Sequence, residues 1–578
     1  MSKRPYSTSL MLLTSAKIII NIEYTMNKVQ RIEDAILQVP QIVDGVLSDQ
    51  LVEALKERVS DFQEKKEKFN WISVPLVGAF SAGKSSLLNF LLGKEELLPI
   101  DSMPETAIPY ELYFDTIEHV ELYDEEGVKI DDKPLEQIQE LDAVPGRKAK
   151  VYVNSDILRH YHDLGIALVD MPGLKSGVDR HEKAITHYIG LNKEAVFVYC
   201  VGIQEGNLDI TDLAFLRELQ AYGQASCVIL TKCNLSTPHA VEETTKKISE
   251  QLINEAGLKD PVVASVGNVD IKGLSDYLDG LDVDNIRANR LLPYAKAIVG
   301  KAIEQLKICC EVRKADVANV NQKILALEEE IEKLNGENPV DSGIGDSPEQ
   351  STQDIMDDVM QKLEERVEDL AKLYIDGKSQ EEVNQFVVRI VRPAIITSFK
   401  EECRQYMDAL SSTIDKELVE ALIGMEIQPI IIGEDGSVDD IVNEITPIAE
   451  ILVELLPESM QSLARRILEI LPMLTKVFTK VFGVNKGKQL AKACTMLRED
   501  AIPGIAEVLR PKVFDIVSKS QIMIQEQVTK AAIEKIEQYK QELLAKASEA
   551  NHDKSKMEQE ILNFEGAIKQ LQSLNITI

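Results

Sequence analysis

The chain has 578 residues and a formal net charge of −32, with 44% hydrophobic and 28% charged residues. A chain of this length is expected to form several domains, and its apolar content is sufficient for folded cores. The acidic excess argues against nucleic acid as a partner, because phosphate binding requires concentrated Lys and Arg. Aromatic residues make up only 5%, which favours long helices over a β-sandwich.

The seven cysteines are scattered and contain no Cys-x-x-Cys pair. This pattern argues against a disulfide framework or a zinc site and indicates a reducing compartment. No run approaches the roughly 20 apolar residues that span a bilayer. Lys3, Arg4 and the apolar stretch Leu10–Leu13 resemble the start of a signal peptide, but Lys17 interrupts the stretch. We therefore expect a cytoplasmic protein, with export through this N-terminal segment as the alternative.

Residues 28–69 show apolar residues at helical spacing and are predicted to be helical. Between residues 71 and 283, short β-branched runs alternate with helical patterns, which is the βαβ rhythm of a mostly parallel sheet. A hairpin-like insertion is expected around Tyr110–Phe114 and Val120–Tyr123, turning near Glu126-Gly127. The predicted strands of the main sheet are Ile72–Val77, Ile166–Val169, Ala195–Val201, Cys227–Leu230 and Val262–Val266.

From about residue 285 the chain is predicted to be almost wholly helical. Two apolar stripes with steps of three and four are typical of a coiled-coil seam. They suggest an antiparallel stalk, and the alternative is that each stripe faces an ordinary bundle core. The stripes are Val317, Val320, Ile324, Leu327, Ile331 and Leu334, and then Met557, Ile561, Phe564, Ile568 and Leu571.

The motif with the most definite chemistry is Gly78–Ser85, which reads Gly-Ala-Phe-Ser-Ala-Gly-Lys-Ser and matches G-x-x-x-x-G-K-[ST]. It follows a predicted strand and opens a predicted helix, which is the context that a phosphate-binding loop requires. Backbone N–H groups of such a loop surround phosphate oxygens. We expect Lys84 to bridge the β- and γ-phosphates and Ser85 to offer its hydroxyl to Mg²⁺.

Asp170-Met171-Pro172-Gly173 follows the predicted strand Ile166–Val169. An Asp at a strand end can hold Mg²⁺ through water, and the N–H of Gly173 can bind the γ-phosphate. Thr106 lies between the two motifs, where it is expected to ligate Mg²⁺ when the γ-phosphate is present; the alternative is an ordinary loop residue.

Thr231-Lys232-Cys233-Asn234 follows the predicted strand Cys227–Leu230. Guanine-specific GTPases place Asp at the last position, because its carboxylate accepts from both guanine N1–H and the exocyclic amine. Asn234 has a single acceptor oxygen, and its NH₂ group would face a donor, which puts base selectivity in doubt. Lys232 can still pack under the base, and Ala264-Ser265 is a candidate for a backbone contact with it.

These residues together resemble a bacterial dynamin-like protein, a GTPase of the dynamin superfamily. The resemblance covers the G domain by its motifs and the rest of the chain by architecture. It implies GTP, Mg²⁺ and a monovalent cation, K⁺ or Na⁺, that Ser81 helps to bind. Two residues depart from the pattern: Phe80 replaces the Gln of eukaryotic dynamins, and Asn234 replaces Asp. The expected nucleotide-binding residues are Gly78, Ser81, Ala82, Gly83, Lys84, Ser85, Ser86, Gly173, Thr231, Lys232 and Asn234.

The resemblance also implies how hydrolysis proceeds. Leu174 and Lys175 follow Gly173, so no Gln is placed there to position water, and the phosphate-binding loop contains no Arg. Paired G domains, from a second copy or a related dynamin-like partner, are therefore expected to complete the site. Basal hydrolysis is expected to be slow, with Ser81, Lys84, Thr106 and Asp170 taking part.

A basic segment stands out within the acidic chain. Residues 463–492 carry seven basic residues and one acid, interspersed with apolar residues and interrupted by Pro472, Gly483 and Gly487. A cationic, amphipathic and broken segment of this kind suits an anionic membrane surface. The alternative is a buried helical pair or a protein-binding surface. The expected membrane residues are Arg465, Arg466, Lys476, Phe478, Lys480, Phe482, Lys486 and Lys488.

The predicted fold is an α/β P-loop GTPase domain with a mostly parallel sheet, joined to a long all-α stalk with a tip. The expected protein is a dynamin-like GTPase, peripheral on the membrane; the alternatives are a regulatory NTPase that binds a protein, and a scaffold insensitive to nucleotide. The expected domains are an N-terminal extension (1–27), neck helices (28–70), the G domain (71–284), the first part of the neck and stalk (285–430), the tip (431–494) and returning helices (495–578).

Overall fold

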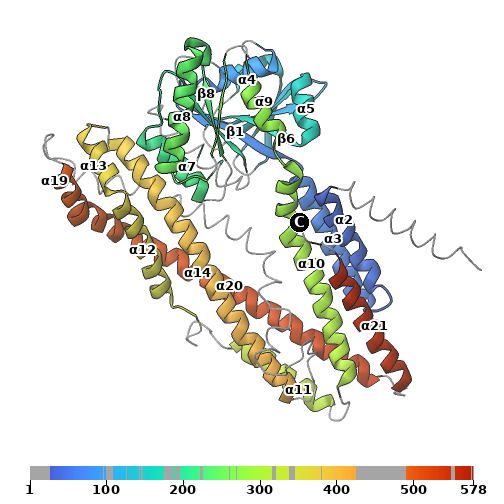
Figure 1. The fold of residues 1–578 in the computed structure, drawn as a ribbon. Helices are drawn as coiled ribbons and strands as arrows, with labels where there is room; N and C mark the ends of the chain where they lie inside the picture. Colours follow the sequence, from blue (N-terminus) through green and yellow to red (C-terminus); the bar gives the residue numbers. More distant parts are fainter. Residues whose placement is uncertain are drawn as a thin grey trace, which may run out of the picture.

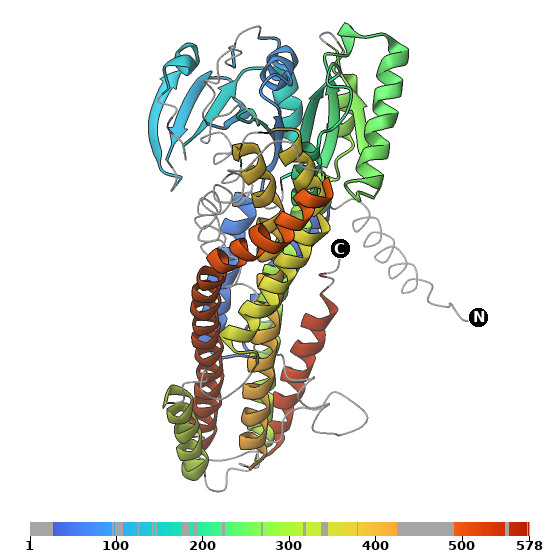
Figure 2. The same ribbon diagram turned by 90° about the vertical axis from the view of Figure 1, so that its left-hand side faces the viewer.

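The computed structural model describes residues 27–94, 97–98, 108–124, 127–141, 144, 147–174, 185, 188, 195–221, 226–259, 261–267, 270–315, 320–336, 345–378, 380–424, 490–548, 554–574 and 576. A sheet domain lies at one end of an elongated assembly of helices (Figures 1 and 2). Within these residues, no helix combines the length and the apolar character that crossing a bilayer requires. Thr106, the eight expected membrane residues and the segment Leu10–Lys17 lie outside the described residues.

The nine described strands form one sheet in the order β4-β3-β5-β2-β6-β1-β7-β8-β9. Its half from β6 to β9 is parallel, as the alternation of strands and helices predicted. The strands are β1 (Ile72–Gly78), β2 (Tyr110–Phe114), β3 (His119–Tyr123), β4 (Lys129–Pro134), β5 (Lys148–Val153), β6 (Ile166–Asp170), β7 (Phe197–Gly202), β8 (Ser226–Thr231) and β9 (Val262–Ser265).

Helices cover both faces of this sheet. Successive side chains of a central strand point to opposite faces, and apolar side chains occur on both. Val74 and Leu76 pack on one face with α4 (Lys84–Leu92), α5 (Asp156–Leu164) and α9 (Lys272–Asp279). Val77 packs on the other face with α7 (Ile210–Ala221) and α8 (Pro238–Asn254). Near-continuous apolar strands of this kind are expected when both faces of a parallel sheet are buried.

The insertion at the far edge differs from the predicted hairpin. The turn does fall near Gly127, but the strands that it joins are β3 and β4. β3 also pairs with β5, whereas β2 pairs in parallel with β5 and antiparallel with β6. Both predicted segments form strands, β2 and β3. Their pairing with one another was wrong, because the residue pattern of a strand does not specify its neighbour in the sheet.

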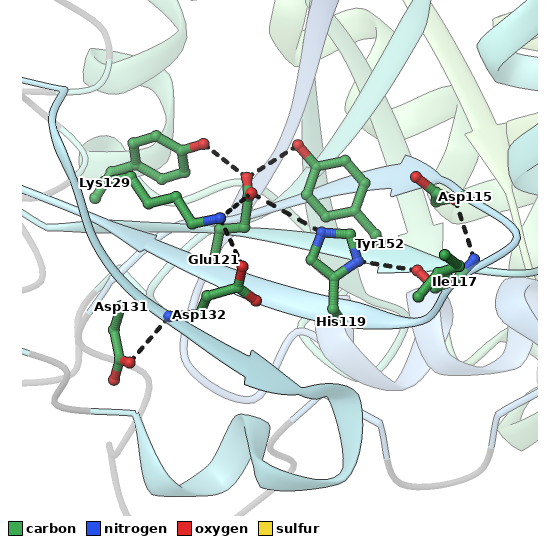
Figure 3. A network of polar contacts seen from close by, with 9 residues as sticks. Asp115, Ile117, His119, Glu121, Lys129, Asp131, Asp132 and Tyr152 are labelled. Carbon is green, nitrogen blue, oxygen red and sulfur yellow. Dashed lines mark hydrogen bonds and ion pairs between the residues drawn. The ribbon is translucent and has the colours of Figure 1, made fainter.

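A polar network holds this edge together (Figure 3). Glu121 accepts hydrogen bonds from Lys129, Tyr123 and Tyr152 at 2.6, 2.6 and 3.2 Å, and His119 stacks on Tyr152 at 4.3 Å. Burial opposes ionisation of Glu121, but the three hydrogen bonds outweigh it and lower its pKa. The network ties β3, β4 and β5 to one another, so its role here is structural.

The helices form two hydrophobic clusters. The first contains α2 (Lys28–Val43), α3 (Asp49–Lys68), α10 (Val283–Lys314) and α21 (Lys554–Ser573), so the N-terminal and C-terminal helices lie in one bundle. The second is built mainly from α11 (Val320–Gly336), α12 (Pro348–Glu365), α13 (Val367–Ile375), α14 (Gln380–Gly424), α19 (Leu490–Met496) and α20 (Ile502–Ser548). The end of α10 also contributes to the second cluster, so α10 connects the two.

The two apolar stripes do not pair with one another. Ile324, Leu327 and Leu334 of α11 belong to the second cluster, and α11 packs on α20. Phe564 and Ile568 of α21 belong to the first cluster, where α21 packs on α10 and α2. The predicted pairing of the two stripes in a coiled coil was therefore wrong, and the alternative of two bundle-facing stripes was right, because a three–four repeat specifies a buried face but not the helix that covers it.

Buried charges line the contact between α10 and α20. Glu304 lies 2.8 Å from Lys301 and 3.7 Å from Lys535, and its side chain is 3% exposed. Tyr539 donates to Glu311 in the same contact. Lys546 donates to the carbonyl oxygens of Val312 and Arg313 at the end of α10. The two clusters are thus joined by ionic and hydrogen-bonding groups as well as by apolar packing.

We predict that Glu304→Gln lowers the free energy of unfolding by about 3 to 5 kcal/mol, because two lysines then lose their buried counter-ion. Thermal and urea denaturation would measure the loss. Lys56→Met removes an exposed Lys56–Glu53 pair and serves as the matched control, with no measurable change expected. Equal stability of Glu304→Gln and the wild type would show that the buried triad does not support the contact.

Candidate functional site

The candidate site forms where β1 ends and α4 begins. β1 runs to Gly78 and α4 starts at Lys84, so the loop between them lies at the carboxyl edge of the parallel strands. A Cβ atom on Gly78 would lie 2.2 Å from the carbonyl oxygen of Cys200 on the neighbouring strand β7, which leaves no room for a side chain. Gly83 adopts a φ of 82°, a conformation that L side chains rarely take. Both glycines are therefore required by the backbone.

Lys84 is buried at the start of α4. Its Nζ donates to the carbonyl oxygens of Gly78 and Ala79, each at 3.1 Å, so the side chain curls back over the loop. Burial lowers the pKa of Lys84, and the nearby charge of Asp170 acts against that effect. In phosphate-binding loops of this kind, the lysine ammonium and the loop N–H groups bind the phosphate oxygens together.

Asp170 ends β6, directly beside β1, and is fully buried. The Ser85 hydroxyl donates to its Oδ2 at 2.7 Å, whereas its Oδ1 is buried with no hydrogen-bond partner among the described residues. Burial raises the pKa of Asp170 to about 6, although the bond from Ser85 and the charge of Lys84 oppose the rise. A buried carboxylate oxygen left unpaired beside a hydroxyl fits a Mg²⁺ ion with its bound water.

Gly173 lies against the phosphate-binding loop. A Cβ atom there would come within 2.6 Å of the Cα atom of Phe80. The next residue bridges the two segments, because Leu174 N–H donates to Gly78 and Phe80 N–H donates to the carbonyl oxygen of Leu174, at 2.9 and 3.0 Å. Ala79 and Leu174, which are 95 positions apart in the chain, thus share one backbone bridge, and it holds Gly173 against the loop.

The segment Thr231–Asn234 reaches the loop from β8. The Thr231 hydroxyl donates to the carbonyl oxygen of Ala82 at 2.6 Å, and Lys232 Nζ donates to that of Ser81 at 2.7 Å. Lys232 has a φ of 57°, the one positive value among the described residues other than glycine. Its aliphatic part passes beside Gly83. Asn234 is exposed and lies next to Gly267.

A cavity of about 670 Å³ adjoins this segment. It takes one wall from α4 and another from the ends of β8 and β9. Ser86 and Lys232 were expected to bind nucleotide, and both line it; Asn234 does not. The lining residues are Gly83, Ser86, Leu87, Asn89, Phe90, Gly93, Lys94, Thr231, Lys232, Leu235, Val266 and Gly267.

Several residues that line the cavity belong to no sequence motif, so the sequence did not predict them. Phe90 and Leu235 are 44% and 59% exposed, so each offers apolar surface to the cavity that it lines. Val266 and Gly267 lie just beyond Ala264-Ser265, the pair expected to approach the base. Asn89 is fully engaged, because its side chain donates to and accepts from the backbone of Leu98.

The structure therefore brings together Lys84, Ser85, Asp170, Gly173 and Lys232, which are far apart in the chain. Gly78, Ala82, Gly83 and Thr231 shape the backbone around them, and Ser81 is exposed on the loop, where its carbonyl oxygen binds Lys232. The structure does not place Thr106.

Among curated proteins, none matches this chain. Solved structures of an oligomerised bacterial dynamin pair, described as a mechanism for long-range sensing and tethering of membranes, match with TM-scores of 0.31 and 0.30 at 13% identity, covering 98% of this chain and 100% of theirs. Toc33 from Arabidopsis thaliana with GDP and Mg²⁺ matches with a TM-score of 0.23 at 14% identity, covering 41% of this chain and 93% of that one.

At these scores the structural likenesses carry no conclusion about activity. The match of a family model is more definite, because it covers the residues that build the site. Residues 74–233 match the model of the Dynamin family, from β1 through the phosphate-binding loop and Asp170 to Lys232. This stretch of the chain is therefore similar in sequence to the GTPase domain of that family.

Proposed function

We propose that the protein is a dynamin-like GTPase that hydrolyses GTP to GDP and phosphate. The observation that carries the proposal is the buried cluster of Lys84, Ser85 and Asp170 at the carboxyl edge of β1 and β6. It supplies a cation, a hydroxyl and a carboxylate where a helix N-terminus also favours anions. The family match over the same residues supports GTP as the substrate class.

The phosphates would lie over the loop from Gly78 to Ser85. Lys84 Nζ donates hydrogen bonds to the carbonyl oxygens of Gly78 and Ala79. When nucleotide binds, Nζ would donate to phosphate oxygens, either in place of these bonds or in addition to them. The N–H of Gly173, held at the rim by the Leu174 bridge, would bind the terminal phosphate. Each of these groups favours the extra negative charge that builds on the phosphate oxygens during transfer.

Ser85 and Asp170 would hold Mg²⁺, together with Thr106. The ion neutralises charge between the β- and γ-phosphates when it is bound. Asp170 suits this role because its buried Oδ1 has no hydrogen-bond partner in the part of the chain that the structure describes, while its Oδ2 accepts the bond from the Ser85 hydroxyl. Ser81 would contribute to a site for K⁺ or Na⁺, as the resemblance to dynamin-like proteins implies.

The base would enter the cavity beside Lys232, with the aliphatic part of Lys232 beneath its ring. Phe90 and Leu235 would contact the ring from the rim. Asn234 provides less discrimination than Asp for guanine, because one amide oxygen replaces two carboxylate acceptors. We therefore propose GTP binding with weaker selectivity against other purine nucleotides than an Asp at this position would give.

We further propose that paired G domains, of two copies or of a related partner, complete the site, and that the helices transmit the nucleotide state to an anionic membrane. The support for membrane contact is the composition of residues 463–492. A regulatory NTPase that binds a protein would share the same site, and lipid binding separates the two functions.

We predict that Lys84→Ala weakens GTP affinity about 10- to 100-fold, because a charge-assisted bond to phosphate is lost. A melting curve checks that the variant is folded, because Lys84 is one of the groups that compensate the buried charge of Asp170. Titration with a fluorescent GTP analogue measures the loss. Lys129→Ala, at the far edge of the sheet, is the control and should bind as the wild type does. Unchanged affinity of Lys84→Ala would refute the phosphate site.

Asn234→Asp should raise selectivity for GTP over ATP and XTP about 10- to 100-fold, because a second acceptor then meets the two guanine donors. Competition binding with the three nucleotides gives the ratios. Asn254→Asp makes the same chemical change on the exposed end of α8 and controls for added charge. The proposed placement of the base would be wrong if Asn234→Asp left all three affinities unchanged.

The membrane proposal predicts that the protein sediments with anionic vesicles and not with neutral ones. Changing Lys476, Lys480, Lys486 and Lys488 together to Glu should abolish sedimentation, because the basic segment then repels the lipid. The control changes four exposed lysines elsewhere to Glu, namely Lys56, Lys68, Lys246 and Lys362. Equal losses in both quadruple variants would indicate a non-specific charge effect and remove the proposal.

A further inference from the structure

The helical assembly touches the sheet domain at a second place, far in sequence from the joints at residues 70 and 282. α14 packs against α7 (Figure 1). On α7, Thr211, Phe215 and Glu218 lie on one face, at positions i, i+4 and i+7 of the helix. On α14, Arg389 and Arg392 are buried, with exposed fractions of 4% and 5%. Buried arginines on a long helix imply a specific partner.

Three charged side chains take part in the contact, namely Arg389, Arg392 and Glu218. Arg392 Nη1 donates to Glu218 Oε1 at 2.7 Å, and the Glu218 side chain is 1% exposed. Arg389 Nη1 donates to the carbonyl oxygen of Thr211 at 2.8 Å, and its guanidinium lies 5.2 Å from the centre of the Phe215 ring. The apolar share is small: Ala214 joins the cluster of the second bundle, and Ile210 packs against it.

This contact is built to be reversible. Burial of an ion pair costs the hydration free energy of both charges, and their mutual attraction offsets only part of that cost. The pair therefore stabilises a contact less than apolar packing of the same size does. Compensation is incomplete here, because Nε of Arg392 is buried without a hydrogen-bond partner among the described residues. Polar contacts between domains of one chain are the kind that open and close. In the open form both charges regain water.

α7 is tied in turn to the strand next to the phosphate-binding loop. Asp212 of α7 accepts a hydrogen bond from the Tyr199 hydroxyl of β7. Tyr199 is paired with Val77 of β1, and the following residue, Cys200, is the one whose carbonyl oxygen abuts Gly78. A continuous chain of packed groups therefore runs from Arg389 through α7 and β7 to the loop.

We propose that Arg389 and Arg392 form an autoinhibitory latch that holds α14 against α7 and restrains the nucleotide site through β7. The restraint rests on the proposed function, whereas the latch itself does not. When the latch opens, α14 leaves α7 and the loop gains the freedom that rearrangement during hydrolysis requires.

Arg392→Met tests the latch. In the closed form the variant keeps Glu218 buried but without Arg392 as its counter-ion, whereas in the open form Glu218 is hydrated, so the change destabilises only the closed form. The variant is expected to open, which small-angle X-ray scattering detects as a larger radius of gyration. Glu218→Met in addition replaces the ion pair by two apolar side chains, which fit the buried contact and should restore the compact form. Arg404→Met, on an exposed position of the same helix, is the control and should scatter like the wild type.

The same four proteins are then compared for GTP hydrolysis at one low protein concentration. We expect Arg392→Met to hydrolyse GTP at least about fivefold faster than the wild type, the lower end of typical coupling between sites, and the double variant to return to the wild-type rate. Melting curves confirm that each variant is folded, and the double variant separates opening from general damage because it carries the same Arg392→Met change.

An unchanged radius of Arg392→Met, or a double variant as expanded as the single one, would overturn the latch. An expanded Arg392→Met with an unchanged or slower rate would overturn its autoinhibitory role. Failure of the proposed function looks different: the wild type would then bind no fluorescent GTP analogue, while the scattering comparison would still decide whether the latch exists.

Discussion

A single buried carboxylate organises the nucleotide domain. Asp170 is completely enclosed at the end of β6, and a charge in that position is tolerated only beside compensating groups. Ser85 and Lys84 supply them, which requires α4 to begin beside β6. That placement brings the loop so close to its neighbours that Gly78 and Gly173 have no space for a Cβ atom. The unpaired Oδ1 then gives the cluster its capacity for a divalent cation.

The arrangement of the helices depends on a different requirement, the burial of their apolar faces. Each long helix presents an apolar face that must be covered, and two separate clusters cover them, with α10 taking part in both. The contact between α10 and α20 is rich in buried charge, as is the contact between α14 and α7. A buried ion pair requires its two side chains to be aligned. Its separation costs less free energy than separation of an apolar contact of the same size, because the charges regain their hydration. Both contacts between parts of the chain thus contain buried charged groups in addition to apolar packing.

Much of the nucleotide site followed from local sequence. A glycine-rich loop between a strand and a helix has few other uses, so it predicts the roles of Lys84 and Ser85, and the Asp-Met-Pro-Gly motif at a strand end predicts that of Asp170. The cavity beside them was not foreseen. Phe90 comes from the outer turns of α4 and Gly267 from the loop after β9, and neither carries a motif, because a cavity wall needs only shape and apolar surface. The exposed position of Asn234 next to Gly267 likewise emerged only in three dimensions.

By itself the sequence determined the class of the fold, the positions of most strands and the helical regions on both sides of the sheet domain, and it predicted the chemistry of the loop from Gly78 to Ser85. These properties depend on periodicity and on residues within a few positions of one another, which a linear pattern records. The tertiary structure alone decided that β3 pairs with β4 and β5, that α11 and α21 belong to different clusters, and that Arg392 meets Glu218. Such pairings depend on which buried faces meet. A repeat of two residues in a strand, or of three and four in a helix, shows which face is buried but not which element covers it.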